Sequence, residues 1–273
     1  TQYGKLPGLF GKTVDMPVYI ETEDKTDPYF PGEGTQNRPF LISTAEQLAK
    51  LAELVNSGNS YYRNKHYKMI DDIDLSGYNA SNTSFNNGKG WIPIGYSYSC
   101  SFIGRFDGGG HTITGLYINN TNGDAAGLFG YVYNGTVENL GLVGVNIIAN
   151  SSDTGGVAGY VNNYSTVQNC YVTGNIDGNG KSNIGGVVGS LNRSTVKNCY
   201  SAAAVINGYN YVGGVAGRAS ITTTVQGCYS TGTVSGSYNV GGIAGIIDSS
   251  TVKDCAALND KVSALVVLGR VAG

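Results

Sequence analysis

Three aspartates in one short stretch, Asp71, Asp72 and Asp74, form the densest acidic cluster of the sequence. Polysaccharide hydrolases and lyases use such carboxylates, sometimes with Ca²⁺, on an exposed sheet. In a strand, Asp72 and Asp74 share one face and Asp71 points to the other. Ile70 and Ile73 break the alternation, so a bulge or turn is expected here. The three aspartates are therefore candidate catalytic residues, or a polar strand end that accepts hydrogen bonds from loop N–H groups.

The two histidines, His66 and His111, lack the spacing of a metal or hydrolase motif. Neither belongs to an HxxxH or Cys/His pattern, so no zinc site is expected. No nucleophile-elbow motif is present, and a Ser/His/Asp arrangement assembled in three dimensions stays open. His111 follows three glycines at a turn entering a strand, which favours a structural role. No cofactor is expected, with Ca²⁺ on the carboxylates as the alternative.

Three tyrosines, Tyr171, Tyr200 and Tyr229, each directly follow a cysteine and recur at a constant spacing. If the cysteines point inward in strands, the tyrosines point outward. An outward aromatic ladder suits glycan stacking or protein contact, which makes these residues candidate ligand contacts. The alternative is that they stabilise the sheet through cross-strand pairs. The single tryptophan, Trp91, is expected in the core of an early coil, with a carbohydrate platform as the alternative.

These residues belong to an internal repeat of about 29 residues, a period typical of solenoids. A Gly-rich five-residue motif has its second glycine at positions 127, 156, 186, 214 and 242. Two further columns recur in phase: Val137, Val167, Val196, Val225 and Val252; and Leu140, Cys170, Cys199, Cys228 and Cys255. Each unit contains about three short runs and no helical periodicity, and it is too short for a propeller blade. The pattern predicts an all-β chain that forms a parallel β-helix, with three short strands per coil and about six to seven coils.

Stacking of equivalent residues in successive coils, about 4.7–4.9 Å apart, gives each column a physical meaning. The valines predict an inward aliphatic ladder and the cysteines an inward ladder of small apolar thiols. A further column lies between them: Asn139, Asn169, Asn198, Gly227 and Asp254. These residue types tolerate left-handed backbone, so a sharp bend is expected there, with asparagine amides hydrogen-bonded along the axis. Five cysteines are an odd number, which leaves at least one unpaired.

The region before the array is expected to lead into it and to cap it. Residues 1–38 hold most of the early prolines and predict a lead-in or linker with a short strand at 18–20. Residues 39–60 predict a capping helix with a capping box at Ser43–Glu46, the apolar stripe Leu48, Leu51, Ala52 and Val55, and Gly58 as its stop. Such a helix suits a lid over the open end of a β-helix. Residues 61–125 predict irregular first coils, with a strand at 67–75 and an insertion loop at 78–90. Residues 126–273 predict the array, whose sixth copy begins at Gly269 and is truncated or continues.

Composition excludes several classes of function. The 273 residues include 42 Gly and 20 Tyr, only 13% are charged, and the net charge is −2. There is no electrostatic case for nucleic acid or an anionic membrane, and no apolar run long enough for a membrane helix. The first residue is Thr rather than Met, which is consistent with a removed leader.

The columns resemble the GLUG repeat family, Gly-rich modules of bacterial surface proteins that include the non-catalytic region of IgA-cleaving metallopeptidases. The matching residues are the motif at 127–130, the four Gly-Gly-aliphatic copies and the Thr-Val-x-x-Cys motif after each. The segments 42–48, 72–75 and 106–113 also look like those that precede such arrays. The resemblance covers about residues 38–273 and implies a right-handed parallel β-helix on a bacterial surface. The peptidase chemistry does not transfer, because the chain lacks His-Glu-x-x-His.

The sequence favours a non-enzymatic surface or secreted module. Its expected role is adhesion, recognition of a host or matrix glycan or protein, or rigid spacing within a larger protein. The charges of the repeats, such as Glu138, Asp153 and Lys181, are scattered over different columns, which favours binding over catalysis. The alternatives are a carbohydrate-active β-helix enzyme and an accessory region of a surface peptidase. No nucleic acid partner and no membrane insertion are expected, and the chain is expected to be an extracellular or cell-surface monomer.

Overall fold

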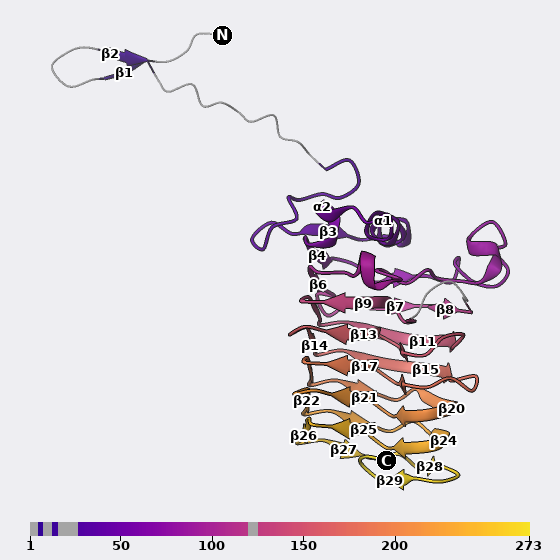
Figure 1. Ribbon diagram of the computed structural model, residues 1–273. Helices are drawn as coiled ribbons and strands as arrows, with labels where there is room; N and C mark the ends of the chain where they lie inside the picture. Colours follow the sequence, from indigo (N-terminus) through magenta and orange to yellow (C-terminus); the bar gives the residue numbers. More distant parts are fainter. Residues whose placement is uncertain (1–4, 8–12, 16–26, 120–124) are drawn as a thin grey trace.

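The chain folds into a β-solenoid of about eight turns, seen in a computed structural model that describes residues 5–7, 13–15, 27–119 and 125–273 (Figure 1). The strand expected at 18–20 lies outside the described residues. Strands β1 (Lys5–Pro7) and β2 (Thr13–Asp15) form a separate antiparallel pair. The ladders of the solenoid itself are parallel, as the repeat predicts.

Three parallel sheets run along the solenoid. The eight-stranded sheet consists of β3 (Phe40–Ile42), β4 (His66–Met69), β6 (Arg105–Asp107), β10 (Thr136–Glu138), β14 (Thr166–Gln168), β18 (Thr195–Lys197), β22 (Thr224–Gln226) and β26 (Thr251–Lys253). The five-stranded sheet consists of β9 (Phe129–Tyr133), β13 (Ala158–Asn162), β17 (Val188–Asn192), β21 (Ala216–Ser220) and β25 (Ala244–Asp248). The fourteen-stranded sheet consists of β5 (Ile73–Asp74), β7 (Thr112–Thr114), β8 (Tyr117–Ile118), β11 (Gly141–Ile148), β12 (Thr154–Gly155), β15 (Tyr171–Asp177), β16 (Ile184–Gly185), β19 (Tyr200–Ser201), β20 (Ala204–Gly213), β23 (Tyr229–Ser230), β24 (Val234–Gly241), β27 (Ala256–Ala257), β28 (Val262–Ser263) and β29 (Leu268–Gly269).

The columns of the repeat stack in register, which confirms the predicted β-helix. Val137 pairs with Val167 and Val167 with Val196, and all three are fully buried. The sixth copy also stacks, because Gly241 pairs with Gly269. Burial of one aliphatic residue per coil in the same column forms a continuous apolar core.

The solenoid has more coils than the six to seven that the repeat count predicted. The additional coil begins with β3, in a segment that the sequence assigned to the capping helix. Phe40 and Ile42 of β3 are fully buried and pair with Tyr67 and Met69 of β4. Three alternating residues are too few to predict a strand from the sequence, so this coil depends on pairing with β4. Phe30, within the expected lead-in, is also buried and packs against Phe40.

The predicted helix is present as α1 (Ala45–Asn56), which lies at the N-terminal end of the stack in Figure 1. Its buried residues are the predicted stripe: Leu48, Leu51, Ala52 and Val55. The capping residue is Thr44 rather than Ser43, since the Thr44 hydroxyl accepts the Gln47 N–H at 3.2 Å. The Gln47 side chain in turn accepts the Ser43 N–H at 2.9 Å, so the reciprocal contact is displaced by one residue. The described residues also contain a second short helix, α2 (Ser60–Arg63), and the 3₁₀ turns η2 (Asn86–Gly88) and η3 (Tyr98–Cys100).

The cysteine column points inward, as predicted, and all five cysteines are free thiols. Cys170, Cys199 and Cys228 are 1% exposed. Each of these thiols donates to the carbonyl two residues earlier, at 3.2 Å. Contact with the Cys199 thiol, together with burial, raises the pKa of Cys228 to about 12. The thiols of the ladder therefore pack in the core, and each donates a hydrogen bond across a bend.

Thiol titration predicts a loss of stability at high pH. The thiol of an unfolded cysteine has a pKa of about 8.5, whereas the pKa of folded Cys228 is about 12. The stabilisation is therefore complete below about pH 8.5 and is lost as the pH rises toward 12. We expect the urea midpoint to fall between about pH 7 and pH 10, and to fall less in Cys228→Ala, which is less stable at neutral pH. An equal fall in both proteins would contradict this assignment.

Candidate binding surface on the repeats

A ladder of asparagines lies at the bend between the eight-stranded and fourteen-stranded sheets. Asn139, Asn169 and Asn198 have φ values of 54°, 54° and 53°, the left-handed backbone that was predicted. The amide of Asn169 donates to Asn139 at 2.9 Å, and that of Asn198 donates to Asn169 at 3.3 Å. The first amide of the ladder, on Asn139, donates to Asp107 at 2.9 Å. The predicted amide ladder is therefore present and holds four successive coils in register.

The tyrosine ladder lies directly beside the asparagines. The rings of Tyr171 and Tyr200 stack with centroids 5.0 Å apart, and those of Tyr200 and Tyr229 at 4.8 Å, with interplanar angles of 3° and 6°. The other side of Tyr171 lies over Gly141, where an added Cβ would be 2.5 Å from the ring. The faces of Tyr200 are therefore covered by its neighbours. Ring edges and hydroxyl groups remain for contact with solvent or a ligand. The outer ring face of Tyr229 also remains, and this residue is 39% exposed.

These two ladders form one surface, which we call the Asn–Tyr corner. Its members are Asn139, Asn169, Asn198, Tyr171, Tyr200 and Tyr229. The strands just before the bend add the outward side chains of Gln168, Lys197 and Gln226, one per coil. An asparagine and a tyrosine therefore occur together in two successive coils, at Asn169/Tyr171 and Asn198/Tyr200, and the next coil combines Tyr229 with the Gln226 amide. Both groups donate and accept hydrogen bonds, as a ligand rich in hydroxyl groups requires.

The aspartate cluster lies on the early coils, and its carboxylates hold loops. Asp72 accepts the backbone N–H of Thr112 at 2.7 Å, which lowers the pKa of this carboxyl below its usual range. Asp74 accepts the N–H and the hydroxyl of Ser76, both at 2.8 Å, which likewise lowers its pKa. The predicted interruption of the strand at 67–75 lies between β4 and β5, so Asp71 lies outside both strands. Carboxyl groups that stay ionised suit hydrogen-bond acceptance better than proton donation at neutral pH.

The two histidines lie in different environments. His111 Nδ1 lies 3.5 Å from Asp72 Oδ1, at the turn that enters β7. His66 lies on β4, and its pKa is lowered by burial and by the nearby charges of Arg105 and Lys65. Among the described residues, no group of three or more His, Cys, Asp or Glu side chains could hold a metal ion.

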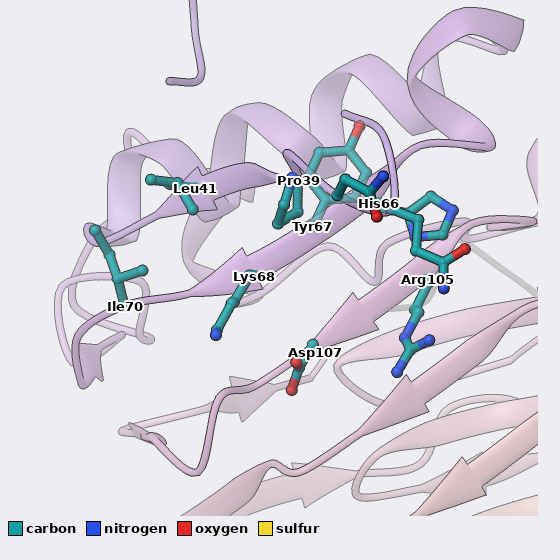
Figure 2. Close-up of a pocket in the computed structure, with 10 residues that line it drawn as sticks. Pro39, Leu41, His66, Tyr67, Lys68, Ile70, Arg105 and Asp107 are labelled. Carbon is teal, nitrogen blue, oxygen red and sulfur yellow. The ribbon is translucent and has the colours of Figure 1, made fainter. Parts of the chain in front are cut away.

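His66 lines a hollow of about 510 Å³ on the outer side of β4 and β6 (Figure 2). Figure 2 shows His66 and Arg105 at one end of this hollow, Leu41 and Ile70 at the other, and Lys68 between them. Asp107 is the one carboxylate among its lining residues, and it already accepts hydrogen bonds from Gly109 and Asn139. The hollow therefore lacks the two facing carboxylates that glycoside hydrolysis commonly uses.

Sequence reasoning missed two features of the early coils. Arg105 forms an ion pair with Glu138, whose side chain is only 3% exposed. In the expected insertion loop at 78–90, the Tyr78 ring contacts both Phe85 and Trp91, and these residues line a groove together with residues of α1; Trp91 is buried, as predicted. Aromatic residues in an otherwise polar loop were the available signal for this second feature.

The fold and its ladders define a parallel β-helix built from Gly-rich repeats. The chain carries GLUG repeats, since the GLUG motif matches residues 150–177 and 208–235. Within the described residues, no helix is long and apolar enough to cross a membrane.

Parts of this chain are similar to known proteins. A provisionally named Gly-rich membrane protein of Evansella cellulosilytica is 40% identical over 114 residues, which are 41% of this chain and 12% of that protein. Halomucin of Haloquadratum walsbyi is 35% identical over 121 residues, 44% of this chain and 1% of that protein. The chain thus spans only a small part of both relatives. A crystal structure from Bacteroides ovatus, provisionally named an immunoglobulin A1 protease, has 28% identity and a TM-score of 0.71 over 88% of this chain and 73% of that one. Together these matches support a non-catalytic surface or accessory β-helix module.

Proposed function

We propose that this β-helix recognises a glycan through the Asn–Tyr corner, as a non-catalytic module of a protein of the cell envelope or extracellular space. The observation that carries the proposal is the in-register stack of Tyr171, Tyr200 and Tyr229 beside the asparagine ladder. The names of the two relatives, a membrane protein and a halomucin, support the cellular location.

The chemistry of the corner favours a hydroxyl-rich, extended ligand. Burial and the neighbouring phenols raise the pKa of Tyr200 further above neutrality, and its protonated hydroxyl can donate a hydrogen bond. Amides and phenols can exchange hydrogen bonds with sugar hydroxyls in both directions. Because the same groups recur in each coil, one extended chain can contact several coils at once, and weak contacts add up. A compact ligand would use only one coil and lose this advantage.

A glycan array with matched tyrosine variants tests the proposal. Tyr200→Ala removes the middle ring, and we expect it to weaken binding about tenfold, the equivalent of about 1.4 kcal/mol. Tyr164→Ala is the control, because Tyr164 is 75% exposed in the turn before β14, at another corner of the coil. Circular dichroism checks that both variants keep the fold. An array without signal would favour a rigid spacer, and binding that survives in Tyr200→Ala would assign the ligand to another surface.

A further inference from the structure

A groove of about 580 Å³ lies between α1 and residues 78–96, on the first coils of the solenoid. Its aromatic residues are Tyr78, Phe85, Trp91 and Tyr96, and α1 contributes Glu46, Lys50 and Glu53 to its rim. Figure 1 shows the loop that carries η2 projecting beyond α1. A groove of this volume, apolar and with a few polar groups, is typical of small-molecule sites.

The groove is held in place by hydrogen bonds from both sides. The Asn56 side chain of α1 donates to Pro93 O at 3.0 Å and accepts the N–H groups of Gly95 and Tyr96 at 2.8 and 3.1 Å. The indole N–H of Trp91 donates to Leu128 O at 3.1 Å. These contacts join α1 to residues 91–96, and join those residues to Leu128 in the next coil. A ligand would enter a preformed site, which reduces the entropy lost on binding.

The loop at 78–90, which forms one wall of the groove, is held by contacts within the loop. The rings of Tyr78 and Phe85 contact edge to face, with centroids 4.7 Å apart. The amides of Asn82 and Asn86 close the loop by donating to Gly77 O at 2.8 Å and Gly90 O at 2.9 Å. Burial and the charge of Glu46 raise the pKa of Tyr78 further above neutrality.

We propose that this groove is a binding site for a neutral oligosaccharide. A pyranose ring offers an apolar C–H face to Phe85 and Tyr96, and its hydroxyls reach the carboxylates of Glu46 and Glu53. A purely apolar ligand would desolvate this charged rim without replacing its hydrogen bonds. Lys50 pairs with Glu53 at 2.8 Å, so the two carboxylates and one ammonium leave the rim negative and disfavour an acidic sugar.

The groove is independent of the Asn–Tyr corner. It is built from residues 46–96, whereas the corner is built from residues 139–229. Variants of one site therefore leave the other unchanged, and failure of one proposal is distinguishable from failure of the other.

The single tryptophan provides a fluorescence measurement, because Trp91, although 1% exposed, is among the residues that line the groove. The probes are maltotriose, cellotriose and chitotriose, with trigalacturonic acid as the acidic control. We expect a saturable change in Trp91 fluorescence with at least one neutral probe and none with the acid. Phe85→Ala is expected to weaken this binding at least about tenfold, and Glu46→Gln, a surface change that keeps the fold, by several-fold.

Two results would overturn the assignment. One is the absence of a saturable change with all three neutral probes in the folded wild-type protein. The other is binding that persists in both Phe85→Ala and Glu46→Gln. If Tyr200→Ala removed that persisting binding, the sugar would bind at the Asn–Tyr corner and not in the groove.

Discussion

Replacing Arg105 by Met is expected to lower the free energy of unfolding by about 3–5 kcal/mol, since it leaves a buried carboxylate without its cation. Arg105 on β6 forms an ion pair with Glu138 on β10, and the Gln168 side chain on β14 donates to the other Glu138 oxygen. The Glu138 side chain is 3% exposed, whereas the Arg105 side chain is 44% exposed, so the carboxylate is desolvated in the folded protein and depends on the guanidinium that covers it. The network also joins three successive coils on their outer side. Urea denaturation at neutral pH measures the loss.

Two controls separate the buried charge from the loss of packing. Glu138→Gln keeps the shape and removes the charge, so it should cost much less than Arg105→Met. The double variant Arg105→Met with Glu138→Met should recover most of the loss, because no uncompensated charge remains. A loss below about 1 kcal/mol, the range of exposed pairs, would show that Glu138 is not stabilised in this way.

Replacing Gly213 by Ala is expected to destabilise the protein by about 3 kcal/mol, through a clash in the core of the stack. An added Cβ would lie 1.9 Å from Ala216 O in its own coil and 2.8 Å from the Ala244 Cα in the next. Both contacts are with backbone, so no flexible side chain can move away. Gly185 and Gly241, its register partners, show the same short approaches, at 2.1 and 2.0 Å to the carbonyl three residues later. Gly213 therefore lies in a column where close backbone packing excludes a side chain.

A matched glycine on the surface provides the control. Gly77→Ala would place its Cβ where nothing lies within 4 Å, so its effect on the unfolding free energy should stay within about 0.5 kcal/mol. Urea denaturation of both variants gives the comparison. Equal midpoints for Gly213→Ala and the wild type would mean that the backbone of adjacent coils relaxes around the new methyl group.

The repeat region was predictable in detail because its signals are local and recur. The valine column, the inward cysteines and the left-handed asparagines each follow from one position repeated every 27–30 residues. Parallel stacking in register then converts each column into a ladder. The outward direction of the tyrosines follows from strand alternation, whereas their role in binding stays a prediction.

The first coils were less predictable because they do not repeat. The sequence contains two adjacent hydroxyl residues, Ser43 and Thr44, that suit a helix cap, and in the structure Thr44 is the cap. The strand β3 has only three residues and depends on β4 for its hydrogen bonds. Short elements of this kind are decided by tertiary contacts rather than by propensity.

The sequence by itself determined the solenoid, the content of its ladders and the bends between its sheets, because one period repeats the same residue types at the same places. Only the tertiary structure decided the eight-coil stack, the Arg105–Glu138 pair and the aromatic groove. Arg105 and Glu138 are 33 residues apart, and the groove joins a helix to a loop about 30–40 residues later. Such groups meet only when coils stack and α1 packs against them, and no spacing in the sequence encodes that contact.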